Sequence, residues 1–249
     1  MQAIFAGKLQ YFRKFPIIYR QKFNDLPCFP ALYGTGEPED PLFIDKIPPA
    51  GYLKHEMRGG VSVQVIAGKA RRLLLKTIPG MDTRPTQDRI KETLFNILQR
   101  DVPGCRFLDL FAGTGAIGIE ALSRGAQRAV FVDNSRKAVA CIRENLAHTH
   151  METEATVMDT DALAAIRRLS LQGARFDIIF LDPPYDADLE MPVLRALDKA
   201  GILAVNGLVI VEARVGKTLE GLDETGFAIT REKEYKNNKH IFLKRKEEA

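Results

Sequence analysis

The sequence predicts an α/β fold in which helices cover a mostly parallel sheet. Asp109, Asp133, Asp159 and Asp182 each follow a short apolar run, and they are 24, 26 and 23 residues apart. This interval fits one strand, one helix and their connections, and the intervening stretches have helical apolar spacing. Right-handed crossovers bring the carboxyl ends of parallel strands to one edge of a sheet. We therefore expect all four aspartates to line one crevice, where open α/β sheets bind ligands.

A small basic unit is predicted before these repeats. Residues 61–66 and 71–76 are expected to form two short strands around Ala67 and Gly68, and residues 85–99 a helix with Pro85 in its first turn. Residues 57–100 carry a net charge of +6, whereas the whole chain carries +4. This concentration favours an RNA-facing surface, although a solvated basic face is the common alternative. The candidate RNA contacts are Arg58, Lys69, Arg71, Arg72, Arg84 and Lys91, with Arg84 and Lys91 the leading candidates for phosphate.

The remaining elements complete a seven-stranded sheet. Strands are predicted over residues 106–110, 129–132, 155–158, 176–181 and 207–212, and helices over 116–124, 135–148, 161–169 and 191–200. Residues 227–232 and 240–244 are expected to close the sheet as an antiparallel pair around a polar turn.

A glycine-rich turn follows the first of the parallel strands. Residues 113–118, Gly-Thr-Gly-Ala-Ile-Gly, match the G-x-G-x-x-G pattern, so a dinucleotide is one candidate ligand. A pyrophosphate disfavours nearby carboxylates, and Asp109 stands four residues before Gly113. A cofactor with a sulfonium, an amino group and a ribose but no phosphate suits this turn better, which indicates S-adenosylmethionine.

The aspartates after the next two strands are candidate cofactor contacts. We expect Asp133 to accept hydrogen bonds from the ribose hydroxyls, and Asp159 or Asp161 to meet the adenine amino group. Asp159 and Asp161 are equally suited to capping the following helix.

The sequence Asp182-Pro183-Pro184-Tyr185 follows the fourth predicted parallel strand. The Asp182 carboxylate and the Pro183 carbonyl offer two rigidly held acceptors for the N–H groups of a planar amine. Tyr185 offers a ring on which a base stacks, a contact worth about 1 to 3 kcal/mol. The pattern favours methyl transfer to a nucleobase amine, with Asp182, Pro183 and Tyr185 as catalytic candidates. In the alternative interpretation, the prolines end the strand and Asp182 caps the next helix.

Several motifs together resemble one enzyme family. Residues 108–115, Leu-Asp-Leu-Phe-Ala-Gly-Thr-Gly, occur with residues 65–69, 83–86, 94–98 and the Asp182 motif in the right order and at fitting separations. In this respect residues 57–245 resemble the bacterial 16S ribosomal RNA guanine-N2 methyltransferases of the RsmD type. The resemblance implies a Rossmann-like class I methyltransferase fold and methylation of N2 of one guanine in small-subunit rRNA, within partly assembled particles. The expected cofactor-binding residues are Asp109, Phe111, Gly113, Thr114, Gly115, Asp133, Asn134, Asp159 and Asp161.

Two other functions are compatible with these motifs. A DNA adenine-N6 or cytosine-N4 methyltransferase uses the same Asp-Pro-Pro-Tyr motif to hold its acceptor amine. Such enzymes normally need a sizeable extra domain to read duplex DNA, whereas only a basic segment of about 50 residues flanks the core here. A non-catalytic RNA-binding module is the more distant alternative, and the intact Asp182 motif beside the glycine turn disfavours it.

The sequence predicts three regions. Residues 1–56 do not fit the family, and we expect them to be a poorly ordered extension or an artefact of the gene start, with translation beginning at Met57. Residues 57–100 form the basic unit, and residues 101–249 the methyltransferase domain. Three widely spaced cysteines give neither a disulfide framework nor a zinc pattern, and no metal is expected. Without an apolar run of about 18 residues, we expect a cytoplasmic, monomeric enzyme with no membrane span.

Overall fold

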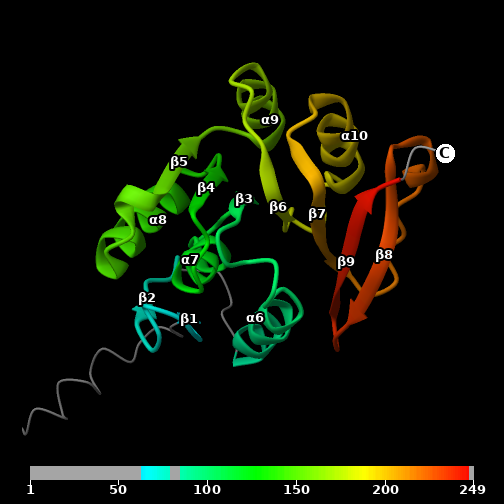
Figure 1. The fold of residues 1–249 in the computed structure, drawn as a ribbon. Coiled ribbons are helices and arrows are strands. Elements are labelled where there is room, and N and C mark those ends of the chain that lie inside the picture. Colours follow the sequence, from blue (N-terminus) through cyan, green and yellow to red (C-terminus); the bar gives the residue numbers. More distant parts are fainter. Residues whose placement is uncertain (1–62, 79–84, 247–249) are drawn as a thin grey trace, which may run out of the picture. The chain divides into compact units, whose positions relative to one another are not determined.

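A seven-stranded sheet with helices on both faces dominates the computed structural model, which describes residues 63–78 and 85–246 (Figure 1). The strand order is β5-β4-β3-β6-β7-β9-β8, and the antiparallel pairings in this sheet are those of β9 with β7 and β8. The strands are β3 (Arg106–Leu110), β4 (Arg128–Asp133), β5 (Ala155–Asp159), β6 (Phe176–Leu181), β7 (Leu203–Arg214), β8 (Phe227–Glu234) and β9 (Asn238–Arg245). The predicted fold class, a mostly parallel sheet with a late antiparallel hairpin, is confirmed. The proposed extension, residues 1–56, lies outside the described residues.

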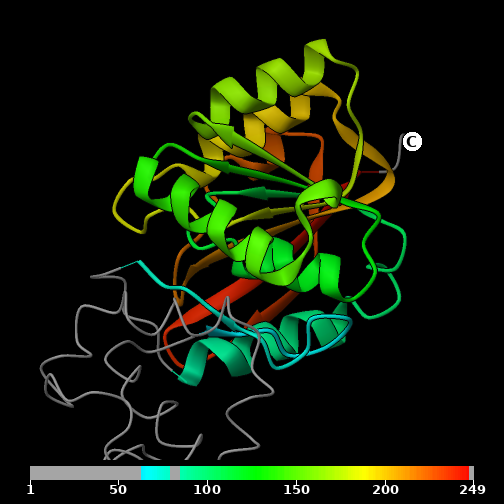
Figure 2. The same cartoon turned by 90° about the vertical axis from the view of Figure 1, so that its left-hand side faces the viewer.

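Each face of the sheet has its own apolar core. The helices are α6 (Pro85–Ile97), α7 (Ala116–Ser123), α8 (Arg136–Thr149), α9 (Ala162–Leu171) and α10 (Glu190–Ala200), with short 3-10 turns at Glu152–Glu154 and Leu222–Glu224. Phe107, Phe131 and Phe180 point toward α6, α7 and α8, whereas alternate residues of the same strands pack on α9 and α10. Figure 2 shows the sheet between these two layers. Both faces are covered, which explains why the parallel strands read as nearly continuous apolar runs. None of the helices in the described part of the chain combines the length and the apolar character that a membrane span requires.

Side-chain caps begin α8 and α9 within one residue of the predicted starts. The Ser135 and Asp161 side chains accept from backbone N–H groups in the first turns of α8 and α9, at 3.4 and 2.9 Å. In α7, a Cβ at Gly118 would lie 2.3 Å from the Phe131 ring, so this glycine lets the helix approach β4 closely. The start of α7 is thereby fixed against the sheet.

The N-terminal hairpin is much shorter than predicted. Its strands are only β1 (Val63–Gln64) and β2 (Leu74–Leu75), and residues 65–73 form an extended turn. The expected strand over residues 71–76 is therefore wrong in its first half. The reason is tertiary: the Ala70 N–H donates to Ser123 Oγ at 3.0 Å, and the turn is bound to α7 instead of continuing the ladder.

Gly68 makes this docking possible, and its replacement provides a stability test. It has a φ of 83°, and a Cβ there would lie 1.7 Å from the carbonyl oxygen of Ser123. Gly68→Ala is expected to cost about 3 kcal/mol or more, because backbone must move as well as adopt a strained φ. Gly104, with a φ of 78° and no atom within 4 Å of the position that a Cβ would take, is the matched control. Urea unfolding of Gly104→Ala should show a loss of only about 1 to 2 kcal/mol, and equal losses at the two sites would contradict the close approach.

Candidate functional site

The polar residues at the carboxyl ends of the parallel strands lie along one edge of the sheet. Leu110 of β3 pairs with Val132 of β4 on one side and with Leu181 of β6 on the other, and Asp133 pairs with Asp159 of β5. The glycine turn follows β3, and Asp182 follows β6. As expected from the repeat spacing, the turn and the Asp182 motif therefore lie at the same edge.

The glycine turn is held open by unusual backbone conformations. Phe111, Gly113 and Gly115 have φ values of 72°, 55° and 79°. The Gly113 N–H donates to Asp133 Oδ2 at 2.9 Å, while Asp133 Oδ1 accepts from the Ser135 N–H at 2.8 Å. Asp133 thus ties the turn to the end of β4. Each of its oxygens retains a second lone pair, so the predicted contact with ribose hydroxyls is still compatible with this arrangement.

Asp109 supports the turn from inside the protein. It is 1% exposed, and its Oδ2 accepts from the Gly118 N–H at 3.0 Å. Burial raises the pKa of this carboxyl to about 7; the Gly118 N–H opposes the shift and the charge of Asp133 adds to it. Sequence reasoning placed Asp109 among direct cofactor contacts. Its burial instead makes it a residue that shapes the turn and the start of α7.

The structure separates the two aspartates proposed for adenine. Asp161 caps α9 through the Ala164 N–H, as the alternative interpretation expected. Asp159 is exposed at the end of β5, and no described residue donates a hydrogen bond to its carboxylate. Asn134, directly after β4, is also exposed. Asp159 is the better-placed candidate for an adenine amino group.

Neighbouring side chains contact the loop that carries the Asp182 motif. Tyr185 is 40% exposed, and the guanidinium carbon of Arg214 lies 4.9 Å from the centroid of its ring. Arg214 also pairs with Asp186 at 3.3 Å, and Lys217 pairs with Asp188. Pro183 is buried. One ring face is thus covered by Arg214, so the other face is the one left for a stacked base.

The carboxyl of Asp182 is electrostatically unusual. Solvent reaches the residue, yet the surrounding protein limits its hydration, and this effect raises its pKa well above the usual range. The negative charges of Glu212 and Asp109 raise the pKa further. Burial, followed by the charges of Glu212 and Asp182, also raises the pKa of Tyr185 to about 12, so its hydroxyl stays neutral.

Glu212 is a feature of this edge that sequence reasoning missed. It belongs to β7, pairs across the ladder with His240 of β9, and its carboxylate accepts from Asn238 Nδ2 and from His240 Nε2, the latter at 3.0 Å. A signal was present, because Glu212 ends the predicted strand 207–212 in the same way that aspartates end the others. His240 had no such signal, because its position depends on the register of β9.

The predicted RNA contacts divide into three groups. Arg58 and Arg84 lie outside the described residues. Arg71 and Arg72 are exposed in the hairpin turn, and Lys69 pairs there with Glu154. This turn contacts the end of α7 and the residues just before β5. It therefore lies at the edge of the sheet where the parallel strands begin. The five-residue strand β3 separates that edge from the aspartates by about 17 Å.

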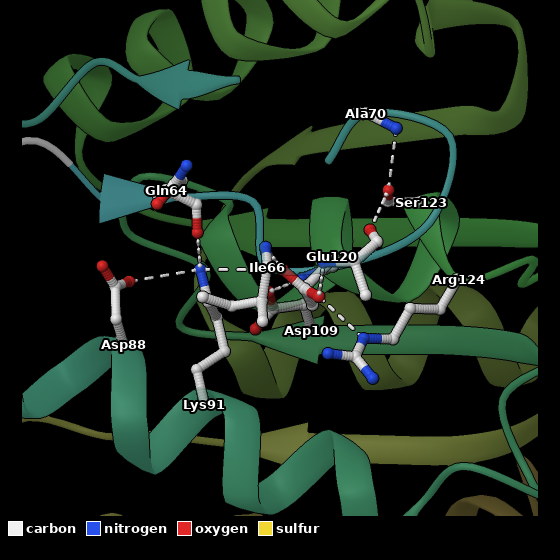
Figure 3. Close-up of polar contacts among 11 residues, drawn as sticks. Gln64, Ile66, Ala70, Asp88, Lys91, Asp109, Glu120, Ser123 and Arg124 are labelled. Carbon is white, nitrogen blue, oxygen red and sulfur yellow. Dashed lines mark hydrogen bonds and ion pairs between the residues drawn. The ribbon is translucent and has the colours of Figure 1, made fainter. Parts of the chain in front are cut away.

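The expectation that Lys91 contacts phosphate is wrong. Lys91 is 4% exposed; its Nζ donates to the Gln64 carbonyl at 2.6 Å and lies 3.6 Å from Asp88 and 3.8 Å from Glu120 (Figure 3). Burial lowers its pKa, and the two carboxylates oppose that shift. The ammonium group therefore links α6, the hairpin and α7 inside the protein.

A small pocket of about 230 Å³ lies near the start of β6, and Asp101, Asp177 and Lys244 are among the residues that line it. It is far from the glycine turn and does not overlap the candidate site. Within residues 63–78 and 85–246, no group of three or more His, Cys, Asp or Glu side chains could hold a metal ion.

Residues 63–244 match the family model described as conserved hypothetical protein 95. The chain is 38% identical to the YlbH protein of Bacillus subtilis over 150 residues, which cover 60% of this chain and 82% of YlbH. It is 36% identical to ribosomal RNA small subunit methyltransferase D of Escherichia coli over 159 residues, covering 63% of this chain and 77% of that one. The solved structure of the Escherichia coli protein YhhF superposes with a TM-score of 0.64 at 32% identity, covering 74% of this chain and 98% of YhhF.

Proposed function

This chain belongs to the RsmD family, described as conserved hypothetical protein 95, and on that basis we propose that it methylates the N2 amine of a specific guanine in 16S rRNA. S-adenosylmethionine is the methyl donor. The observation that carries this proposal is the position of the Asp182 motif beside the glycine turn, at one edge of the sheet. The names of the related proteins support rRNA of the small subunit as the substrate class.

The residues at this edge fit such a cofactor. Its sulfonium supplies an activated methyl group, and its amino acid and ribose portions need close backbone approach and hydrogen-bond acceptors. Gly113 and Gly115 provide the backbone approach through their positive φ values, and Asp133 and Asp159 provide acceptors. Phe111, Thr114 and Asn134 border the same turn and complete the proposed set. A cluster of carboxylates suits a cationic cofactor better than a pyrophosphate.

Asp182, Pro183 and Tyr185 act on the acceptor base. The guanine leaves its stack, which costs a few kcal/mol, and lies on the open face of Tyr185. The Asp182 carboxylate and the Pro183 carbonyl accept from the N2 amine and orient its nitrogen for in-line attack. Positioning of this kind is worth about 7 to 11 kcal/mol in well-oriented systems.

The proposed RNA contacts extend beyond the Asp182 motif. Arg71, Arg72 and Lys69 are proposed to contact rRNA phosphates away from the target base, because the hairpin turn lies at the opposite edge of the sheet. Arg58 and Arg84, outside the described residues, are proposed as further phosphate contacts. A structured RNA or a ribonucleoprotein particle is large enough to contact both edges. We further propose that the enzyme acts as a monomer, in the cytoplasm, on a small-subunit particle.

A substrate panel tests the proposal. The protein and methyl-labelled S-adenosylmethionine are incubated separately with unmethylated small subunits, free 16S rRNA and DNA. Label is expected in the rRNA of the particle and none in DNA. Because Asp182, Pro183 and Tyr185 suit any planar exocyclic amine, transfer to DNA alone would instead support the DNA methyltransferase alternative. Cofactor binding without transfer to any polymer would support a non-catalytic module.

A further inference from the structure

A chain of buried and half-buried polar groups leads away from Glu212. The Glu212 carboxylate accepts hydrogen bonds from Asn238 Nδ2 and His240 Nε2. His240 is 1% exposed, and its Nδ1 lies 3.1 Å from the hydroxyl of Tyr235. Because a carboxylate only accepts, Nε2 carries the hydrogen and Nδ1 accepts from Tyr235 when the ring is neutral. Both Glu212 oxygens are therefore stabilised as those of an anion.

Asp182 lies beside this anion without equivalent support. Leu181 pairs with Val211, so Asp182 and Glu212 follow at the same level on neighbouring strands. No described residue donates a hydrogen bond to the Asp182 carboxylate. When two nearby carboxyls compete for one proton, the group with fewer donors keeps it. The raised pKa of Asp182, caused by limited hydration and then by Glu212 and Asp109, agrees with this assignment.

Asp109 of β3 and Glu212 of β7 act directly on this carboxyl. The other titratable or charged groups on the neighbouring elements are Arg214 of β7, His240 of β9, Tyr235 of the β8–β9 turn, and Tyr185 of the Asp182 loop itself. Arg214, the cation of this set, is engaged by Asp186 and by the Tyr185 ring. Carboxylates therefore dominate the surroundings of Asp182.

We propose that Glu212 is a positioning residue that makes Asp182 a proton-holding carboxyl, which releases its proton when the cationic cofactor binds and takes one from the amine after transfer. This inference rests on the proposed function. In the transfer, the nitrogen–carbon bond forms, the carbon–sulfur bond breaks and its electron pair stays on sulfur. The proton that the nitrogen loses moves to the Asp182 carboxylate, and the sulfide product is neutral. The resting state is thereby restored.

Calorimetry of cofactor binding tests this cycle without RNA. S-adenosylmethionine and S-adenosylhomocysteine are titrated into the protein at several pH values between 5 and 8, in buffers of different ionisation enthalpy. At the pH where the difference is largest, the wild type is expected to release up to about one proton more with the sulfonium than with the neutral sulfide. Asp182→Asn should lose this difference, and Glu212→Gln should lose a measurable part of it, because the limited hydration of Asp182 remains. Glu234→Gln, an exposed glutamate of β8, is the matched control and should retain it.

The outcomes separate the inference from the proposed function. If neither ligand binds, the proposed function fails. If both bind and wild type and Asp182→Asn release the same number of protons, only this inference is refuted; an unchanged release in Glu212→Gln refutes the role of Glu212. Should Glu212→Gln not fold, carbon-13 NMR of labelled aspartate decides. The signal missing in Asp182→Asn should titrate well above the usual range near 4, and a midpoint in that range would overturn the proposal.

Discussion

Asp182→Ala is expected to lower kcat by about 10² to 10⁴-fold, the range typical of a positioned group that handles a proton. The variant removes the proposed acceptor for the amine, while the glycine turn and Asp133 remain in place. Affinity for S-adenosylmethionine should stay within about tenfold of the wild type, because the proposed role of Asp182 is mainly toward the acceptor base. Single-turnover kinetics on small subunits and equilibrium cofactor binding measure the two effects separately.

The same loop offers a control for this experiment. Asp188 is an exposed aspartate six residues after Asp182, and it pairs only with Lys217 among the described residues. Asp188→Ala should change kcat by less than about fivefold, because exposed ion pairs contribute at most about 1 kcal/mol. A large loss of cofactor binding in Asp182→Ala, with kcat preserved, would show that the role of Asp182 is misassigned.

Glu120→Gln is expected to destabilise the protein by about 3 to 5 kcal/mol, the cost of leaving buried cations without their partner. Glu120 is fully buried in α7 and accepts from the Ile66 N–H at 2.8 Å, the Ala67 N–H at 3.0 Å and Arg124 Nε at 2.7 Å. Its carboxylate also lies 3.8 Å from Lys91 Nζ (Figure 3). The neutral Gln amide removes the negative charge, and its NH₂ group is a donor facing other hydrogen-bond donors. Urea unfolding measures the loss of stability.

Glu144→Gln is the matched control for this effect. Glu144 pairs with Lys76 at 2.7 Å, and both side chains are largely exposed. Its loss should cost less than about 1 kcal/mol, because solvent and salt already screen the pair. Equal destabilisation by the two substitutions would mean that the buried network does not hold the hairpin and α6 to the core.

The sequence predicted the parallel core because the relevant signals are local. Each aspartate stands near, at or directly after the carboxyl end of its strand, and the strand-to-strand interval specifies one crossover helix, so the spacing alone places Asp133 and Asp182 at one edge. The family resemblance supplied what spacing alone does not specify, the identity of the base and of the RNA.

The features that escaped prediction depend on contacts between distant segments. Lys91 belongs to a basic run, and only the packing of α6 against α7 shows that its charge is internal. The contact between Glu212 and His240 joins residues 28 apart, and it requires a register that no local pattern specifies. Asp161 fits both a cap and a ligand contact by sequence, and the structure assigns the cap.

The identity of the methylated nucleoside is the most direct test of the proposed chemistry. Small subunits treated with the protein and labelled S-adenosylmethionine are digested to nucleosides and analysed by mass spectrometry, with DNA treated in parallel. We predict N2-methylguanosine, at one position of the 16S rRNA and absent with Asp182→Ala. N6-methyladenine or N4-methylcytosine in the DNA digest, with no methylated guanosine from the rRNA, would contradict this prediction.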